Sequence, residues 1–103
     1  MNIMETNKHT EYVPFAAVHP TEIVKDEIKA RGMSQKELAF RMGMKLSDLS
    51  RLLKGEDITP AVAAKLEVAL DIPSESWLNL QTQYEIDSKN VALRDEQEAA
   101  AIK

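Results

Sequence analysis

The segment 34–55 constrains the fold of this chain more than any other, because its signals bound two very short helices in succession. Ser34 and Glu37 form a capping box, the serine-and-glutamate spacing that starts a helix. Gly43 supplies the left-handed conformation that ends a helix, and Gly55 does the same for the next one. We therefore expect helices at 35–42 and 46–54.

Four residues in this segment indicate how the two helices pack. Ala39, Gly43, Leu49 and Leu52 are spaced 4, 6 and 3 residues apart. Ala39 allows the helices to cross closely, and Gly43 permits a tight turn between them. Leu49 and Leu52 share one face of the second helix, so the opposite face is free to enter a DNA major groove. Because such short, tightly joined helices are uncommon in an ordinary helix hairpin, the pattern favours a DNA-binding helix-turn-helix.

Similar start and stop signals predict three more helices. Pro20 suits the first turn of a helix, with His19 helping to start it, and Gly32 ends it. Thr59 before a proline is an N-cap signal, and Ser74 is expected to cap the last helix. Hydrophobic periodicity then places these helices at 20–31, 60–70 and 75–86.

The fold class that follows is all-α. Only 5% of the 103 residues are aromatic, and good helix formers dominate, which argues against a sandwich or barrel. We expect one five-helix domain over 19–86, preceded by an extended N-terminal arm at 1–18. Residues 87–103, with few apolar anchors, are expected to form a weakly helical C-terminal tail.

Composition excludes several kinds of chemistry. The chain has no cysteine, which rules out disulfides, thiolate metal sites and a cysteine nucleophile, and fits the reducing cytoplasm. No apolar run approaches the roughly 18 residues that span a bilayer. His9 and His19 have no carboxylate at metal-ligand spacing, and no serine has a plausible histidine partner for catalysis. We expect a cytoplasmic protein that is not an enzyme, contacts no membrane and holds no metal or cofactor.

Charge is distributed unevenly around a net value of −4. Residues 31–55 hold six basic and two acidic side chains, a net +4. Residues 1–30 carry a net −2 and residues 56–103 a net −6. A basic middle between acidic ends is compatible with nucleic-acid binding by the middle, although solvated surface helices also carry charge.

The chain resembles the lambda-repressor-like, or XRE-type, helix-turn-helix family. The resemblance lies in HPTEIV at 19–24, GMSQKELA at 32–39, SRLLKG at 50–55 and ITP at 58–60. The ending WLNLQTQYEI at 77–86 resembles the HigA-type antitoxin branch, also known as plasmid-maintenance antidote proteins. The resemblance implies a five-helix dimer that binds the operator of its own operon. It also implies neutralisation of a HigB toxin, one of the RelE-like ribosome-dependent mRNA interferases.

Family positions imply a set of DNA-contacting residues. Gln35, at the start of its helix, should donate to a phosphate, and Arg51 could pair with guanine. Arg41 can add charge nearby. The full DNA-binding set is Gln35, Lys36, Lys45, Leu46, Ser47, Arg51 and Lys54.

Three positions depart from the usual pattern of this family. Lys45 stands where a capping serine or threonine is common, and Leu46 could touch only a thymine methyl group. Asp48 also brings a negative charge close to the phosphates. These departures predict modest DNA affinity, or a dimer that a partner must organise.

Protein contacts are expected mainly from the last helix. Trp77 is expected to close the core, whereas Leu80 and Tyr84 are the better candidates for a dimer interface. A toxin that acts on ribosome-bound RNA should be small and basic, so the acidic ends could dock it. A stand-alone repressor without a toxin is the alternative, and a scaffold that has lost DNA binding is another.

Overall fold

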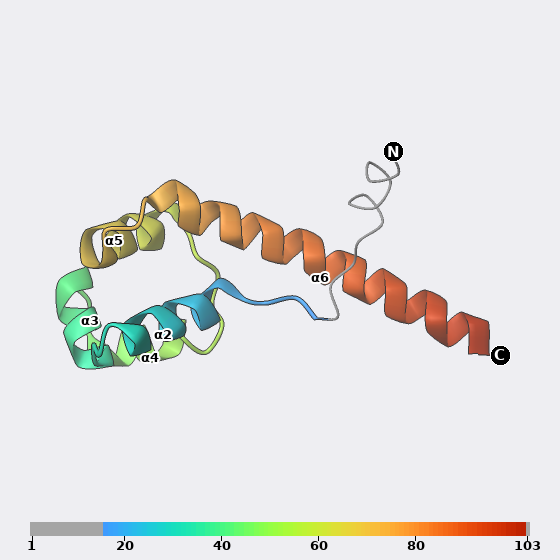
Figure 1. Ribbon diagram of the computed structural model, residues 1–103, viewed down its shortest axis with the longest axis horizontal. Helices are drawn as coiled ribbons and strands as arrows, with labels where there is room; N and C mark the ends of the chain where they lie inside the picture. The colour runs from blue at the N-terminus through green and yellow to red at the C-terminus, as the bar shows by residue number, and fades with distance from the viewer. Residues whose placement is uncertain (1–15, 103) are drawn as a thin grey trace. The chain divides into compact units, whose positions relative to one another are not determined.

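The computed structural model of the chain describes residues 16–102, with side chains described through residue 100. These residues form five helices and no strand, which confirms the expected all-α class (Figure 1). The helices are α2 (Pro20–Ala30), α3 (Gln35–Met42), α4 (Leu46–Leu52), α5 (Pro60–Leu70) and α6 (Ser74–Ile102). Most of the expected N-terminal arm, including His9, lies outside the described residues.

Three helices begin at the side chains that the sequence predicts as caps. The Thr21 amide donates to Nδ1 of His19 at 3.1 Å, and the Glu37 amide donates to Oγ of Ser34 at 3.0 Å. The Val62 amide donates in the same way to Oγ1 of Thr59 at 3.3 Å. Each bond satisfies an amide that the first helical turn leaves unpaired, so local sequence fixes where these helices start.

The end of α4 differs from the expected helix 46–54, because the α-helix stops at Leu52. Its last residues form a tighter turn, in which the Lys54 amide donates to the Arg51 carbonyl at 3.2 Å. The Gly55 amide donates to the Leu52 carbonyl at 3.0 Å, and Gly55 has a φ of +122°. Bonds of this shorter spacing replace the α-helical pattern at helix ends, so Lys54 lies in a turn.

The hydrophobic core lies under α3, α4 and α5 and is closed by the start of α6. Leu38, Leu49 and Leu66 are completely buried, and Trp77 is 1% exposed, which confirms its expected place in the core. A hydrogen bond from Arg31 adds to this packing. Arg31 donates from Nη2 to the Leu70 carbonyl at 2.8 Å, which joins the ends of α2 and α5.

The buried Gln81 on α6 holds the linker between α4 and α5. Its Oε1 accepts from the Ile58 amide at 2.9 Å, and its Nε2 donates to Oδ1 of Asp57 at 3.2 Å. A buried amide that both donates and accepts leaves little polar cost in the core. This linker therefore has a fixed path on its way from α4 to α5.

Helix α6 is longer at both ends than the expected helix 75–86. Ser74 is its first residue rather than its cap, because the Trp77 amide donates to the Pro73 carbonyl at 3.4 Å; the Ser74 amide donates to Oε1 of Glu67 on α5 at 3.0 Å. The helix continues without a break to Ile102, so the expected helix end at 86 is wrong. The reason is intrinsic propensity, since residues 87–103 contain no glycine or proline and include four alanines.

The chain divides into two compact units, and Val18–Tyr84 forms the larger one. The described residues of the other unit are 16–17 and 85–102. Within the described part of the chain, no helix is both long and apolar enough to cross a membrane.

Candidate nucleic-acid interface

The helices α3 and α4 and the turn between them form the helix-turn-helix that the sequence predicts. Ala39 on α3 is 3% exposed, and α3 packs against both α4 and α5. Gly43 has a φ of +68°, in the left-handed region where a side chain causes strain. Leu49 and Leu52 are buried beneath α4. All four expectations about this packing are confirmed, and they leave the other face of α4 exposed.

The start of α3 presents polar groups at the surface. Gln35 is its first residue and Lys36 its second, and both are exposed. Unpaired amides and the positive end of the helix dipole favour an anion at such a place. The carboxylate of Glu37 accepts from Arg41 at 2.7 Å, and among the described residues only the serine half of the capping box forms. That ion pair also reduces the charge that Arg41 can offer to DNA.

The start of α4 carries three expected base-facing residues on the surface. Lys45 is the N-cap, and its side chain makes no capping hydrogen bond within the described part of the chain. Leu46 is 45% exposed, and Ser47 is exposed beside it. Their position at the start of α4 is compatible with a contact to base edges, and their roles remain predictions.

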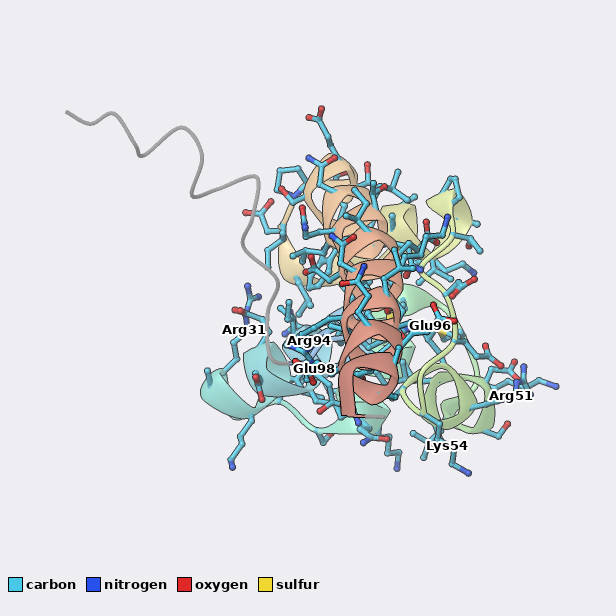
Figure 2. All side chains as sticks on the ribbon, turned by 90° about the vertical axis from the view of Figure 1, so that its right-hand side faces the viewer. Arg31, Arg51, Lys54, Arg94, Glu96 and Glu98 are labelled. Carbon is cyan, nitrogen blue, oxygen red and sulfur yellow. The ribbon has the colours of Figure 1, made fainter. Side chains whose placement is uncertain are left out.

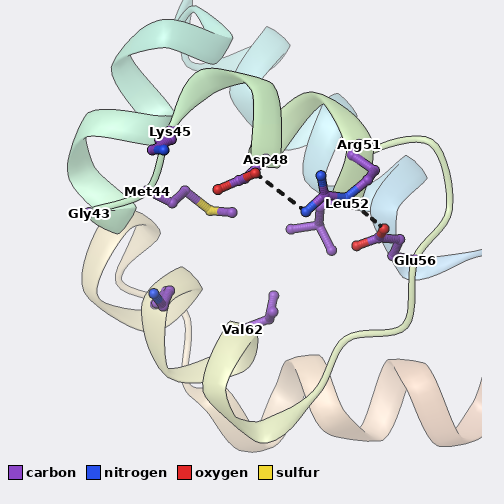
Figure 3. Close-up of a pocket in the computed structure, with 9 residues that line it drawn as sticks. Gly43, Met44, Lys45, Asp48, Arg51, Leu52, Glu56 and Val62 are labelled. Atoms are coloured by element: carbon purple, nitrogen blue, oxygen red, sulfur yellow. Dashed lines mark hydrogen bonds and ion pairs between the residues drawn. The ribbon is translucent and has the colours of Figure 1, made fainter.

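Arg51 lies on the exposed face of α4 between two carboxylates (Figure 3). Its Nη2 is 3.3 Å from Oδ1 of Asp48, and its Nε donates to Oε2 of Glu56 at 3.1 Å. The arginine side chain remains 64% exposed. Asp48 is expected from the sequence to lie near this site, whereas Glu56 is not, and its approach depends on the turn at Gly55.

A depression of about 420 Å³ adjoins this ion-pair cluster. Lys65 of α5 lines it together with Lys45 and Arg51, so three cationic side chains line one depression. Sequence reasoning missed Lys65 because it lies on a different helix from the other two. Figure 2 shows Arg51 and Lys54 pointing outward from this part of the molecule.

Leu80 and Tyr84, the candidates for a dimer interface, both have contacts within their own chain. Leu80 is half-buried and packs against the core cluster. The ring of Tyr84 meets the ring of His19 edge-on, with centroids 4.6 Å apart. Each side chain keeps some exposed surface, and a role in dimerisation remains a prediction.

Metal ligands do not gather anywhere in residues 16–102, where no group of three or more histidine, aspartate or glutamate side chains could hold an ion. His19 instead uses Nδ1 to accept from the Thr21 amide at the start of α2. The exposed side chains of α3 and α4 include hydrogen-bond donors and cations, beside the carboxylates of Asp48 and Glu56.

Comparisons with known proteins agree with this arrangement. Residues 24–77 match the family model described as Helix-turn-helix. The antitoxin HigA-1 of Vibrio cholerae is 36% identical over 84 residues, which cover 80% of this chain and 77% of that protein.

Two solved structures have the same fold. An addiction module antidote protein of the HigA family from Coxiella burnetii matches with a TM-score of 0.66 and 29% identity, over 81% of this chain and 95% of that one. The Pseudomonas aeruginosa antitoxin HigA, solved with the higBA promoter, matches with a TM-score of 0.67 over 81% of this chain and 92% of that one. At 24% identity, the second likeness shows the fold alone. From its family model and its sequence relatives, this chain belongs to the helix-turn-helix family and, within it, to the HigA-type antitoxins.

Proposed function

We propose that this chain is a DNA-binding antitoxin, which represses its own operon as a homodimer and neutralises a small basic toxin. The observation that carries the proposal is the exposed face of α4. Leu49 and Leu52 hold it from below, in a chain that belongs to the HigA-type antitoxins. The DNA partner is the operator of the chain's own operon.

In this proposal the start of α3 and the surface of α4 divide the work of binding. Gln35 and Lys36 contact phosphates and set the position of the domain on the duplex. Lys45, Leu46 and Ser47 face the base edges, and Lys54 adds a phosphate contact from the turn after α4. Arg51 reads guanine in the major groove. A HigA antitoxin solved with promoter DNA has the same fold, which is compatible with DNA binding by this chain.

The proposal that the chain binds a toxin rests on its charge and on its family. Residues 56–103 carry a net −6, and Glu96 and Glu98 of α6 are exposed (Figure 2). A RelE-like mRNA interferase must bind RNA, so its surface should be basic and complementary to these acidic residues. DNA and toxin then bind regions of opposite charge on one chain.

The proposal that the chain forms a homodimer rests on Leu80 and Tyr84. Operators of helix-turn-helix dimers are read as two half-sites about one helical turn apart, so two copies double the contact with DNA. The exposed parts of these two side chains supply the contact between copies in this proposal.

The DNA arm is tested by fluorescence anisotropy with a labelled duplex from the region upstream of the chain's own gene. We expect the affinity to fall steeply with salt, with a log–log slope of roughly −0.9 for each phosphate contacted. A flat salt dependence, or no binding, would leave only the scaffold alternative.

The toxin arm is tested by purifying the tagged chain from its native lysate after nuclease treatment, with mass spectrometry of what remains bound. We expect a stoichiometric small basic protein whose reading frame adjoins this one. If only the chain itself is recovered while the duplex is bound, the protein is a stand-alone repressor.

A further inference from the structure

We infer that Asp48 and Glu56 are positioning residues, which set the edge of the Arg51 guanidinium that is offered to DNA and thereby determine sequence specificity. The inference rests on the proposed DNA-binding function and adds to it a role for two acidic residues in a basic surface.

In this cluster some nitrogens of the Arg51 guanidinium group contact carboxylates and others do not. Nε of Arg51 donates to Glu56 at 3.1 Å, and Nη2 lies 3.3 Å from the Asp48 carboxylate (Figure 3). Arginine has five N–H donors in a rigid planar fork, so two carboxylates cannot occupy all of them. In the described part of the chain neither carboxylate lies at ion-pair distance from Nη1, which with Nη2 forms an edge that suits the O6 and N7 acceptors of guanine.

Each carboxylate is delivered by a distinct piece of backbone. Asp48 lies one helical turn before Arg51 on α4, and therefore on the same face. Glu56 follows Gly55, whose φ of +122° turns the chain back after the helix. The Glu56 amide donates to the Leu52 carbonyl at 3.0 Å, which fixes this return path.

These ion pairs contribute little to folding, because all three side chains are at least 41% exposed and pairs at the surface are weak. Their effect is on which DNA groups, phosphates or base edges, the Arg51 side chain contacts. A long cationic side chain without partners can swing to a phosphate on any duplex, which raises affinity for the wrong sequences. Two carboxylates beside Arg51 bias it away from phosphates, so that it gains most where a guanine meets its free edge.

Two negative charges beside the duplex also weaken binding to every sequence through repulsion of the phosphates. Only a sequence with guanine at the right place recovers the loss through Arg51. The sequence alone suggests that Asp48 only weakens DNA binding. In this proposal its negative charge also contributes to sequence specificity.

The test uses the full chain and two labelled duplexes. One is selected by the wild-type chain from a randomised pool of about 20 base pairs, and the other is a scrambled version of it. The variants are Glu56→Ala, Glu56→Gln and Asp48→Asn. The matched control is Glu75→Ala, which removes one exposed negative charge from the first turn of α6.

For Glu56→Ala we expect affinity for the scrambled duplex to rise about threefold, and the ratio of selected to scrambled affinity to fall about tenfold. The salt slope on the scrambled duplex should steepen by about 0.9, because Arg51 becomes an additional phosphate contact. Glu56→Gln keeps an acceptor for Nε and should lose less of the ratio. Asp48→Asn should lower the ratio less than Glu56→Ala, because its contact is longer.

The inference is overturned if Glu56→Ala changes both affinities by one common factor, or if Glu75→Ala has the same effect. Should Glu56→Ala fail to fold by circular dichroism, an unchanged ratio in Glu56→Gln overturns it instead. If the wild-type chain enriches no sequence from the pool, that result contradicts sequence-specific DNA binding, and the inference about Asp48 and Glu56 falls with it. A normal wild-type ratio with unaffected variants removes the inference alone.

Discussion

Helix α4 and the last part of α6 are both exposed helices, but different forces make them helical. Helix α4 has seven residues, too few to be stable alone, and it exists because Leu49 and Leu52 are buried beneath it. Among residues 85–100 of α6 no side chain is fully buried, and the helix follows from residue propensity. Burial fixes the direction in which α4 presents its side chains, whereas propensity fixes only that 85–102 is helical. A surface that reads DNA requires the first kind of support.

The largest expected effect comes from removing the support of α4. Leu49→Ala deletes a completely buried side chain, so the free energy of unfolding should fall by about 2–5 kcal/mol. Chemical denaturation monitored by circular dichroism measures this loss. An exposed leucine of α6 provides the control, because Leu93→Ala should cost less than about 0.5 kcal/mol. Equal losses for the two variants would show that α4 is not held by burial.

The next effect tests what the supported face does. Arg51→Ala should lower affinity for the selected duplex by about 1–3 kcal/mol and affinity for the scrambled duplex by much less. Anisotropy titrations with both duplexes measure the two losses. Equal losses on the two duplexes would make Arg51 a phosphate contact and would contradict its role as a base reader.

A smaller effect is expected at the turn between the two short helices. Gly43→Ala places a side chain at a φ of +68°, which costs about 1–2 kcal/mol of stability. A Cβ there would meet nothing within 4 Å, so the cost is backbone strain alone. Gly43→Asn should lose less, because asparagine tolerates this conformation. Thermal unfolding of both variants measures these losses. A similar melting temperature for Gly43→Ala and wild type would show that the substitution causes no backbone strain.

The smallest effect concerns the helix held by propensity. Ala92→Gly, at an exposed position inside α6, should weaken the local helix by about 1 kcal/mol. Amide hydrogen exchange of residues 85–102 should then be about fivefold faster near the substitution. Unchanged exchange there would mean that contacts, and not propensity, hold this part of α6.

Local capping chemistry explains which parts of the fold could be predicted from the sequence. Helices α2, α3 and α5 start where His19, Ser34 and Thr59 cap them, because each cap needs only residues two or three positions away. Helix α4 ends earlier than expected because the turn at Gly55 competes with the helix for its last amides. Helix α6 continues further than expected because the apolar pattern fades while helix propensity remains high.

The candidate site was predictable to the same extent. The three-residue spacing of Leu49 and Leu52 predicts that both are buried and that the opposite face of α4 is exposed. The structure confirms that both leucines are buried. Glu56 was missed because its approach to Arg51 depends on the backbone angles of a glycine and not on helical spacing. Lys65 was missed because only tertiary packing brings α5 beside α4.

The central claim is that the exposed surface of α3 and α4 binds DNA, and nuclear magnetic resonance tests it most directly. The isotope-labelled chain is titrated with the upstream duplex while backbone amide shifts are followed. We expect the largest shifts at residues 35–36, 45–47, 51 and 54, with small ones along 60–70. A duplex that binds while these amides stay unchanged would contradict the account.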